Sequence, residues 1–198
     1  MAAWKTQRCL EVDALKSTLI HENAHILSLG ASQSDNNLID DDEWCDGDEC
    51  NDDKWRIIYV QREAACAPNY YAGMCFNEDS YINKFFQKFW ADIYREYIYG
   101  GYKTMSTYEF HQKYYDHFVS NYAATNPSED FAESFTTFVL WDDETIDNYK
   151  RWCKTEYDGG WNLVNEQGLS YWYKCEKIYR DNSIWEEKIR FFYDFPEL

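Results

Sequence analysis

The chain has 198 residues, enough for one domain with its own core, and 45% of them are apolar, which excludes a compositionally disordered protein. Its 36 acidic and 19 basic residues give a formal net charge of −17, which argues against nucleic acid or an anionic membrane as a partner. No apolar run has the length of a membrane span. We therefore predict one domain over residues 1–198, without nucleic-acid binding and without membrane insertion.

Seven cysteines are many for a cytosolic protein of this size, and the number is odd. None has the CxxC spacing of a structural zinc site, so we expect disulfides and a secreted or extracytoplasmic protein. The start of the chain does not have the pattern of a signal peptide. Spacing alone does not fix the disulfide connectivity. The candidate pairs are Cys45 with Cys50, Cys66 with Cys75, and Cys153 with Cys175, which leaves Cys9 unpaired.

The first predicted element is a helix that Asp13 can cap and that Gly30 can end. Its apolar residues recur at helical spacing: Leu15, Leu19, Ile26 and Leu29.

An HExxH motif lies inside this predicted helix, as His21-Glu22-Asn23-Ala24-His25. Residues four apart on a helix lie on one face, so the two imidazoles can reach one tetrahedral metal ion. The glutamate beside the first histidine can take a proton from a metal-bound water, which makes Glu22 the candidate general base. The alternative is two histidines on a helix surface beside an unrelated glutamate.

A polar stretch follows over residues 32–53, and its part from Asp40 to Asp53 is acidic and contains no basic residue. The acidic residues do not have the spacing of an EF-hand loop. Two interpretations stay open, a loose Ca²⁺ site and an acidic surface loop closed by a disulfide.

The remaining elements are mostly helical, so the predicted fold class is mainly α, an α+β fold with a small sheet. A strand is expected at Trp55–Gln61 and a loop between Cys66 and Cys75. Helices are expected at Ser80–Tyr99, from Ser106 or Thr107 to about Tyr122, from Asn126-Pro127 to Leu140, and in two pieces between Ile146 and Phe195 around Gly159-Gly160.

A catalytic zinc needs a third protein ligand and one open position. The best candidate is Glu129, in a segment that reads Asn126-Pro127-Ser128-Glu129-Asp130. Another interpretation needs no metal: with an asparagine N-cap and proline at the first helical position, the glutamate falls at the third position, where it can complete a capping box.

At this segment the chain resembles the gluzincin metallopeptidases, which pair HExxH with a glutamate from a second helix. It is most similar to bacterial zinc-binding metallopeptidases with an Asn-Pro-x-Glu-Asp-Phe-Ala-Glu block, and more distantly to the anthrax lethal factor peptidase family. The resemblance implies Zn²⁺, a zincin-like fold and Glu129 as the third ligand. Glu133, one turn further, would then accept the ring N–H of a ligand histidine; otherwise it is a solvated helix residue.

The resemblance also implies a role for Tyr122, which lies seven residues before Glu129. In the lethal-factor-like peptidases a tyrosine at the matching place hydrogen-bonds the developing oxyanion. A packing tyrosine is the alternative. His111 and His117 are further oxyanion candidates, but their spacing puts them on different helix faces and favours solvated surface histidines.

The function predicted from these motifs is a zinc-dependent peptidase acting on a peptide or protein substrate. Two alternatives belong to other classes: a catalytically silent zincin-fold module that binds a protein or glycan, and a calcium-dependent interaction domain with an accidental HExxH. Gluzincins usually have a small sheet before the HExxH helix, whereas only 20 residues precede His21. We expect either a minimal sheet or a natural protein that continues upstream of Met1.

Overall fold

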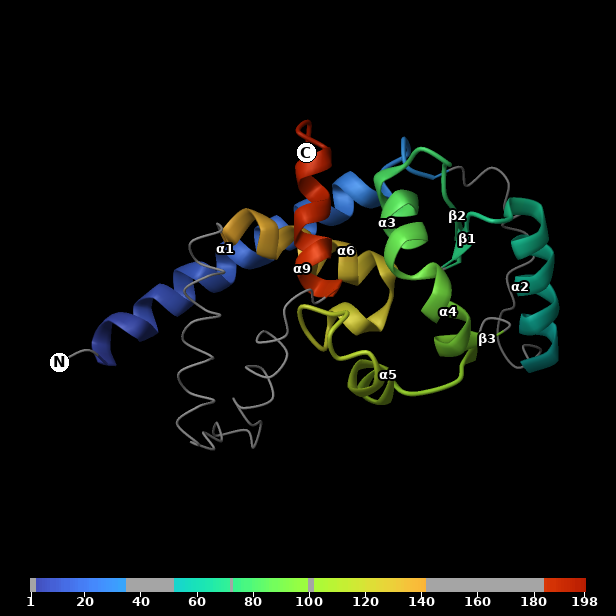
Figure 1. Cartoon of the computed structure of the whole chain (residues 1–198), viewed down its shortest axis with the longest axis horizontal. Coiled ribbons are helices and arrows are strands. Elements are labelled where there is room, and N and C mark those ends of the chain that lie inside the picture. Colours follow the sequence, from blue (N-terminus) through green and yellow to red (C-terminus); the bar gives the residue numbers. More distant parts are fainter. Residues whose placement is uncertain (1–2, 35–51, 72, 100–101, 142–183) are drawn as a thin grey trace.

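A computed structural model describes residues 3–34, 52–71, 73–99, 102–141 and 184–198 (Figure 1). The fold is mainly α, as predicted. The helices in this part of the chain are α1 (Ala3–Leu29), α2 (Asp52–Cys66), α3 (Tyr81–Phe89), α4 (Ala91–Tyr97), α5 (Thr107–Lys113), α6 (Pro127–Leu140) and α9 (Ile184–Phe191), with 3-10 turns η4 (Ala123–Thr125) and η5 (Phe192–Asp194). The strands are β1 (Tyr70–Tyr71), β2 (Met74–Cys75), β3 (Ile98–Tyr99) and β4 (Tyr102–Lys103), and they form two antiparallel hairpins.

The core consists mainly of aromatic rings from α3, α4, α5, α6 and α9. Phe85 of α3 is fully buried and meets Phe131 of α6 edge to face, with ring centroids 5.4 Å apart. Tyr71 of the first hairpin stacks on Phe86. Such ring pairs contribute more to stability than their buried area alone. The cluster therefore holds α6 in a defined position against α3.

Helix α1 packs chiefly against α6, and its N-terminal part extends away from the other labelled elements in Figure 1. It begins at Ala3, ten residues before the predicted cap at Asp13, and ends at Leu29, as expected. The apolar residues Leu15, Leu19 and Ile26 are exposed, so they do not form the face packed on the core. That face carries the small, fully buried Ala24 and Ser28, which allow close approach to α6.

The predicted strand at Trp55–Gln61 is wrong, because these residues lie in α2. Their β-branched residues suggested a strand, but Asp residues at the helix start and the helix formers that follow favour a helix. Within this segment Ile58 is buried, whereas Ile57 and Val60 are exposed.

The segment between Cys66 and Cys75 forms the first hairpin and is closed by a disulfide between these two cysteines, one of the three pairs expected. The other expected pairs, Cys45 with Cys50 and Cys153 with Cys175, lie outside the described residues.

Two predicted helices are shorter than expected. The helix expected at Ser80–Tyr99 is interrupted at Trp90, which is fully buried and separates α3 from α4. The helix expected to reach Tyr122 ends at Lys113, with Tyr114 outside the helical region at φ −113° and ψ 40°. Trp90 is a turn residue buried in the core, and residues 114–117 after α5 also form turns.

The helix from Asn126-Pro127 to Leu140 is confirmed as α6, with Asn126 as its N-cap. In the tail, α9 lies within the range where a helix was expected. The prediction of two helical pieces around Gly159-Gly160 falls outside the described residues.

Candidate metal centre

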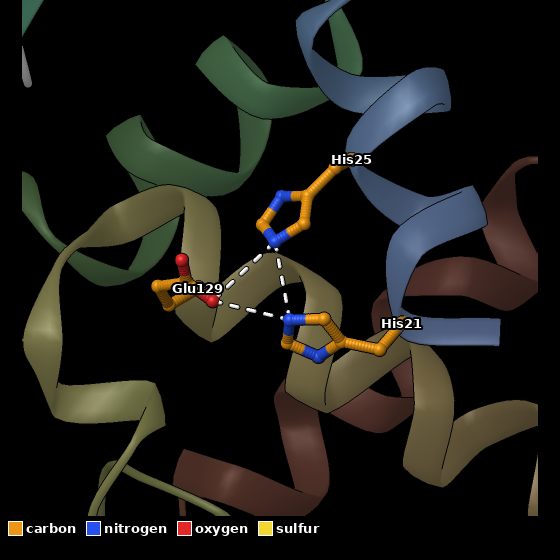
Figure 2. Close-up of side chains that lie close together, drawn as sticks. All are labelled: His21, His25 and Glu129. Carbon is orange, nitrogen blue, oxygen red and sulfur yellow. Dashed lines mark hydrogen bonds and ion pairs between the residues drawn. The ribbon is translucent and has the colours of Figure 1, made fainter. Parts of the chain in front are cut away.

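His21 and His25 lie one turn apart on α1 and point toward the first turn of α6 (Figure 2). Between them Ala24 is fully buried against the core, which sets the rotation of α1 about its axis. The two imidazoles therefore lie at the rim of the α1–α6 contact, with side chains 12% and 20% exposed.

Glu129 of α6 completes a group of three possible ligand atoms. Its Oε2 lies 3.1 Å from His21 Nε2 and 3.3 Å from His25 Nε2. The two Nε2 atoms are 3.1 Å apart. A tetrahedral site with metal–ligand bonds of about 2.0–2.1 Å has edges of about 3.3–3.4 Å. The three separations are therefore close to three edges of a zinc coordination tetrahedron.

In the neutral form of His21, ordinary hydrogen bonding does not satisfy the contact between its Nε2 and Glu129. Nδ1 of His21 lies 3.1 Å from Glu133 Oε1, which assigns the ring proton of the neutral imidazole to Nδ1. Nε2 of His21 then carries a lone pair, and it faces the Glu129 carboxylate, which also only accepts. A cation between them removes this conflict between two acceptors, so the chemistry of the donor set fits a divalent metal.

The two histidines are supported unequally. Glu133 reaches His21 with one carboxylate oxygen, and its other oxygen accepts a hydrogen bond of 2.7 Å from the Ser120 hydroxyl. Such outer partners fix the tautomer and the orientation of a ligand imidazole. Nδ1 of His25 is buried and has no hydrogen-bond partner in the part of the chain that the structure describes.

Local sequence explains why Glu129 stands where it does. The Asn126 side chain accepts hydrogen bonds from the backbone N–H groups of Ser128 and Glu129, both at 3.0 Å, and Pro127 occupies the first turn. The N-cap interpretation and the ligand interpretation are therefore compatible: the backbone of Glu129 is capped, whereas its carboxylate points to α1.

The next residue, Asp130, has a role that sequence reasoning missed. It is fully buried, accepts a hydrogen bond of 2.7 Å from the Trp90 indole and forms an ion pair with the fully buried Lys188 of α9. Burial raises the pKa of Asp130 and lowers the pKa of Lys188, and the attraction between the two groups opposes both shifts. The sequence gives little signal for this pair, because Lys188 stands in α9 beside the charged residues Glu186, Glu187 and Arg190.

Glu22 and Tyr122 are exposed residues near the three ligand candidates. Glu22 is exposed, and Tyr122 is 53% exposed, in the turn before α6. The Tyr122 ring centroid is 5.9 Å from that of His21. The negative charge of Glu129, followed by partial burial and a hydrogen bond to Glu129, raises the pKa of Tyr122, and Glu133 and Glu22 add to this. A tyrosine phenol is protonated at neutral pH and can donate a hydrogen bond.

The other two histidines are not part of this group. His111 of α5 is buried at 6% exposure, so the expected solvated position is wrong for it. The rings of His111 and His117 lie 6.3 and 6.1 Å from the ring of Phe118. Among the described residues, His21, His25 and Glu129 are the group of His, Cys, Asp and Glu that could hold a metal.

The two interpretations of the acidic stretch, a loose Ca²⁺ site and a disulfide-closed loop, fall mostly on residues 35–51, which lie outside the described part of the chain. Asp52 and Asp53, at the end of that stretch, begin α2.

No protein-family model, no curated protein and no solved structure matches this chain. In the described residues, no helix combines the length and the apolar character needed to cross a membrane.

Proposed function

We propose that this protein is a zinc-dependent peptidase of the gluzincin type, with a zincin-like fold and with His21, His25 and Glu129 as its zinc ligands. The carrying observation is that Glu129, more than a hundred positions after the two histidines in the sequence, joins them in a group of three ligand atoms at mutual distances of 3.1, 3.1 and 3.3 Å. Two imidazoles and one carboxylate form a donor set that suits zinc and leaves one tetrahedral position open.

The surrounding residues have the chemistry that peptide hydrolysis needs. When bound, zinc would lower the pKa of a water molecule toward about 7 and polarise a carbonyl group. Glu22, exposed and next to a ligand, would accept the proton of the attacking water and pass it to the leaving amine. The protonated phenol of Tyr122 would donate a hydrogen bond where negative charge develops on the peptide carbonyl oxygen.

The proposed setting is outside the cytoplasm, and the substrate is a peptide or protein. The disulfide between Cys66 and Cys75 supports this location, because such bonds persist in oxidising compartments. The exposure of Glu22 and Tyr122 supports a site that a polypeptide can reach.

The test has two parts, and the first is metal content. Zinc measured by elemental analysis on untagged protein should be about one ion per chain in the wild type and greatly reduced in His21→Ala. Glu109→Ala, at the start of α5, is the matched control and should keep its zinc. A wild type without zinc after supplementation would overturn the proposal.

The second part is turnover of an unstructured protein such as casein. Glu22→Gln should retain zinc and lose about 10²- to 10⁴-fold of the rate, the usual contribution of a general base. If the wild type holds zinc but does not cleave casein or a mixed peptide library, the fold serves as a binding module and the peptidase proposal is wrong.

A further inference from the structure

Ser120 occupies a junction between the candidate metal centre and the turn that carries Tyr122. Its hydroxyl oxygen accepts a hydrogen bond of 3.0 Å from the backbone N–H of Ala123. Its hydroxyl proton goes to Glu133 Oε2 at 2.7 Å. A serine hydroxyl has one proton, so these two contacts use it as a donor to Glu133 and as an acceptor from Ala123.

The second contact fixes a carboxylate that solvent can reach. The side chain of Glu133 is 27% exposed, so water competes for its oxygens. With Oε1 at His21 Nδ1 and Oε2 at the Ser120 hydroxyl, both ends of the carboxylate are held, and the group bridges α1 and the turn before α6. Without Ser120, rotation of the Glu133 side chain toward water would leave the His21 ring free to turn.

The first contact fixes the turn itself. The bond from the Ala123 N–H to Ser120 closes the turn at residues 120–123, and η4 begins at Ala123 within it. Ala123 and Ala124 are fully buried, so this turn is anchored in the core while the Tyr122 ring stays near His21.

We infer that Ser120 is a positioning residue for the metal centre, which holds Glu133, and through it the His21 imidazole, in the orientation that binds metal. This inference rests on the proposed zinc site. It assigns no contact between Ser120 and substrate or metal, and it concerns a residue outside both metal-binding motifs.

The test measures zinc affinity by competition with a chelator, so it needs no substrate. Ser120→Ala should weaken zinc binding by about 3- to 10-fold, the effect of one hydrogen bond to a charged group acting through a second residue. Ser120→Thr, which keeps the hydroxyl, should bind zinc like the wild type. If the alanine variant does not fold, Ser120→Val takes its place, since valine and threonine have the same shape and differ in the hydroxyl.

A double-mutant cycle separates positioning from a general loss of stability. Glu133→Ala alone should weaken zinc binding by about 10- to 100-fold. In that background Ser120→Ala should add less than about 2-fold, because the group on which it acts has gone. Ser106→Ala is the matched control: this serine also bridges a backbone N–H and a glutamate, at the start of α5, and its loss should leave zinc affinity unchanged.

The outcomes distinguish the two proposals. Equal zinc affinity in the wild type and Ser120→Ala would overturn the role of Ser120 and leave the zinc site intact. An effect of the same size with and without Glu133 would make Ser120 a structural residue and also overturn the inference. A wild type that binds no zinc would overturn the proposed function, and the role of Ser120 with it.

Discussion

Helices α5 and α6 begin with similar sequence chemistry but use it differently. At α5, Ser106 and Glu109 form a closed capping box: the Ser106 side chain accepts from the Glu109 N–H at 3.3 Å, and the Glu109 carboxylate accepts from the Ser106 N–H at 2.9 Å. At α6, Asn126 caps the N–H of Glu129, but the Glu129 carboxylate turns away to the histidines of α1.

The difference shows that a glutamate at the third helical position has no fixed role. The α5 start is exposed and satisfies its own backbone groups. The α6 start lies against α1, and the buried pair Asp130–Lys188 ties it to α9. At α6 the Glu129 carboxylate faces the imidazoles of α1 instead of its own helix start, and the Asn126 side chain alone caps the backbone there.

The largest expected effect comes from breaking the buried ion pair between Asp130 and Lys188, which holds the start of α6 and has no counterpart described at α5. Lys188→Met should lower the free energy of unfolding by about 3–5 kcal/mol, because Asp130 would be left as a buried, unpaired charge. Urea denaturation followed by tryptophan fluorescence measures this loss.

The matched control for this prediction is the double variant Asp130→Asn/Lys188→Met. Asparagine keeps an acceptor for the Trp90 indole but removes the charge, so most of the lost stability should return. A double variant as unstable as Lys188→Met would show that packing around the lysine, rather than the unpaired charge, causes the effect.

The second expected effect concerns the two glutamates directly. Glu129→Ala should weaken zinc binding by more than about 100-fold, beyond the range for an outer partner, because a ligand is removed. Glu109→Ala removes a glutamate from the same position of a helix and should leave zinc affinity unchanged. Both are measured by chelator competition. If Glu129→Ala keeps its affinity for zinc, Glu129 is only a helix-start residue, like Glu109.

A smaller effect is expected at the caps themselves. Asn126→Ala and Ser106→Ala should each lower the free energy of unfolding by about 1 kcal/mol, the usual cost of an N-cap. Only Asn126→Ala should also weaken zinc binding, because the α6 start positions a ligand. Thermal unfolding and chelator competition on both variants test the pair, and an equal effect on zinc would contradict the comparison.

Local patterns predicted the start of α6 and the HExxH spacing, because caps and helical periodicity depend on neighbours in sequence. Only together with the resemblance to the gluzincins did they point to Glu129 and Glu133, which the structure brings to His21. They did not predict Ser120, whose contact with Glu133 depends on a turn that interrupts an expected helix. The strand predicted at Trp55–Gln61 was wrong, because β propensity is a weak preference and these residues lie within the helix that begins at Asp52.

The smallest expected effect is the pH dependence of the self-contained α5 start. Hydrogen bonds from the Ser106 side chain and backbone lower the pKa of Glu109 below its usual value. A lowered pKa in the folded state means that the contribution of Glu109 to stability is full above the unfolded-state pKa and is lost as the pH falls through the folded-state pKa. Glu109→Gln should therefore lower the unfolding midpoint slightly near neutrality but not at acidic pH, so that the midpoint of the variant falls less steeply than that of the wild type as the pH is lowered. Parallel midpoint-against-pH curves for the two proteins would show that the capping box at α5 is not formed in solution, and the contrast with α6 would then lose its reference.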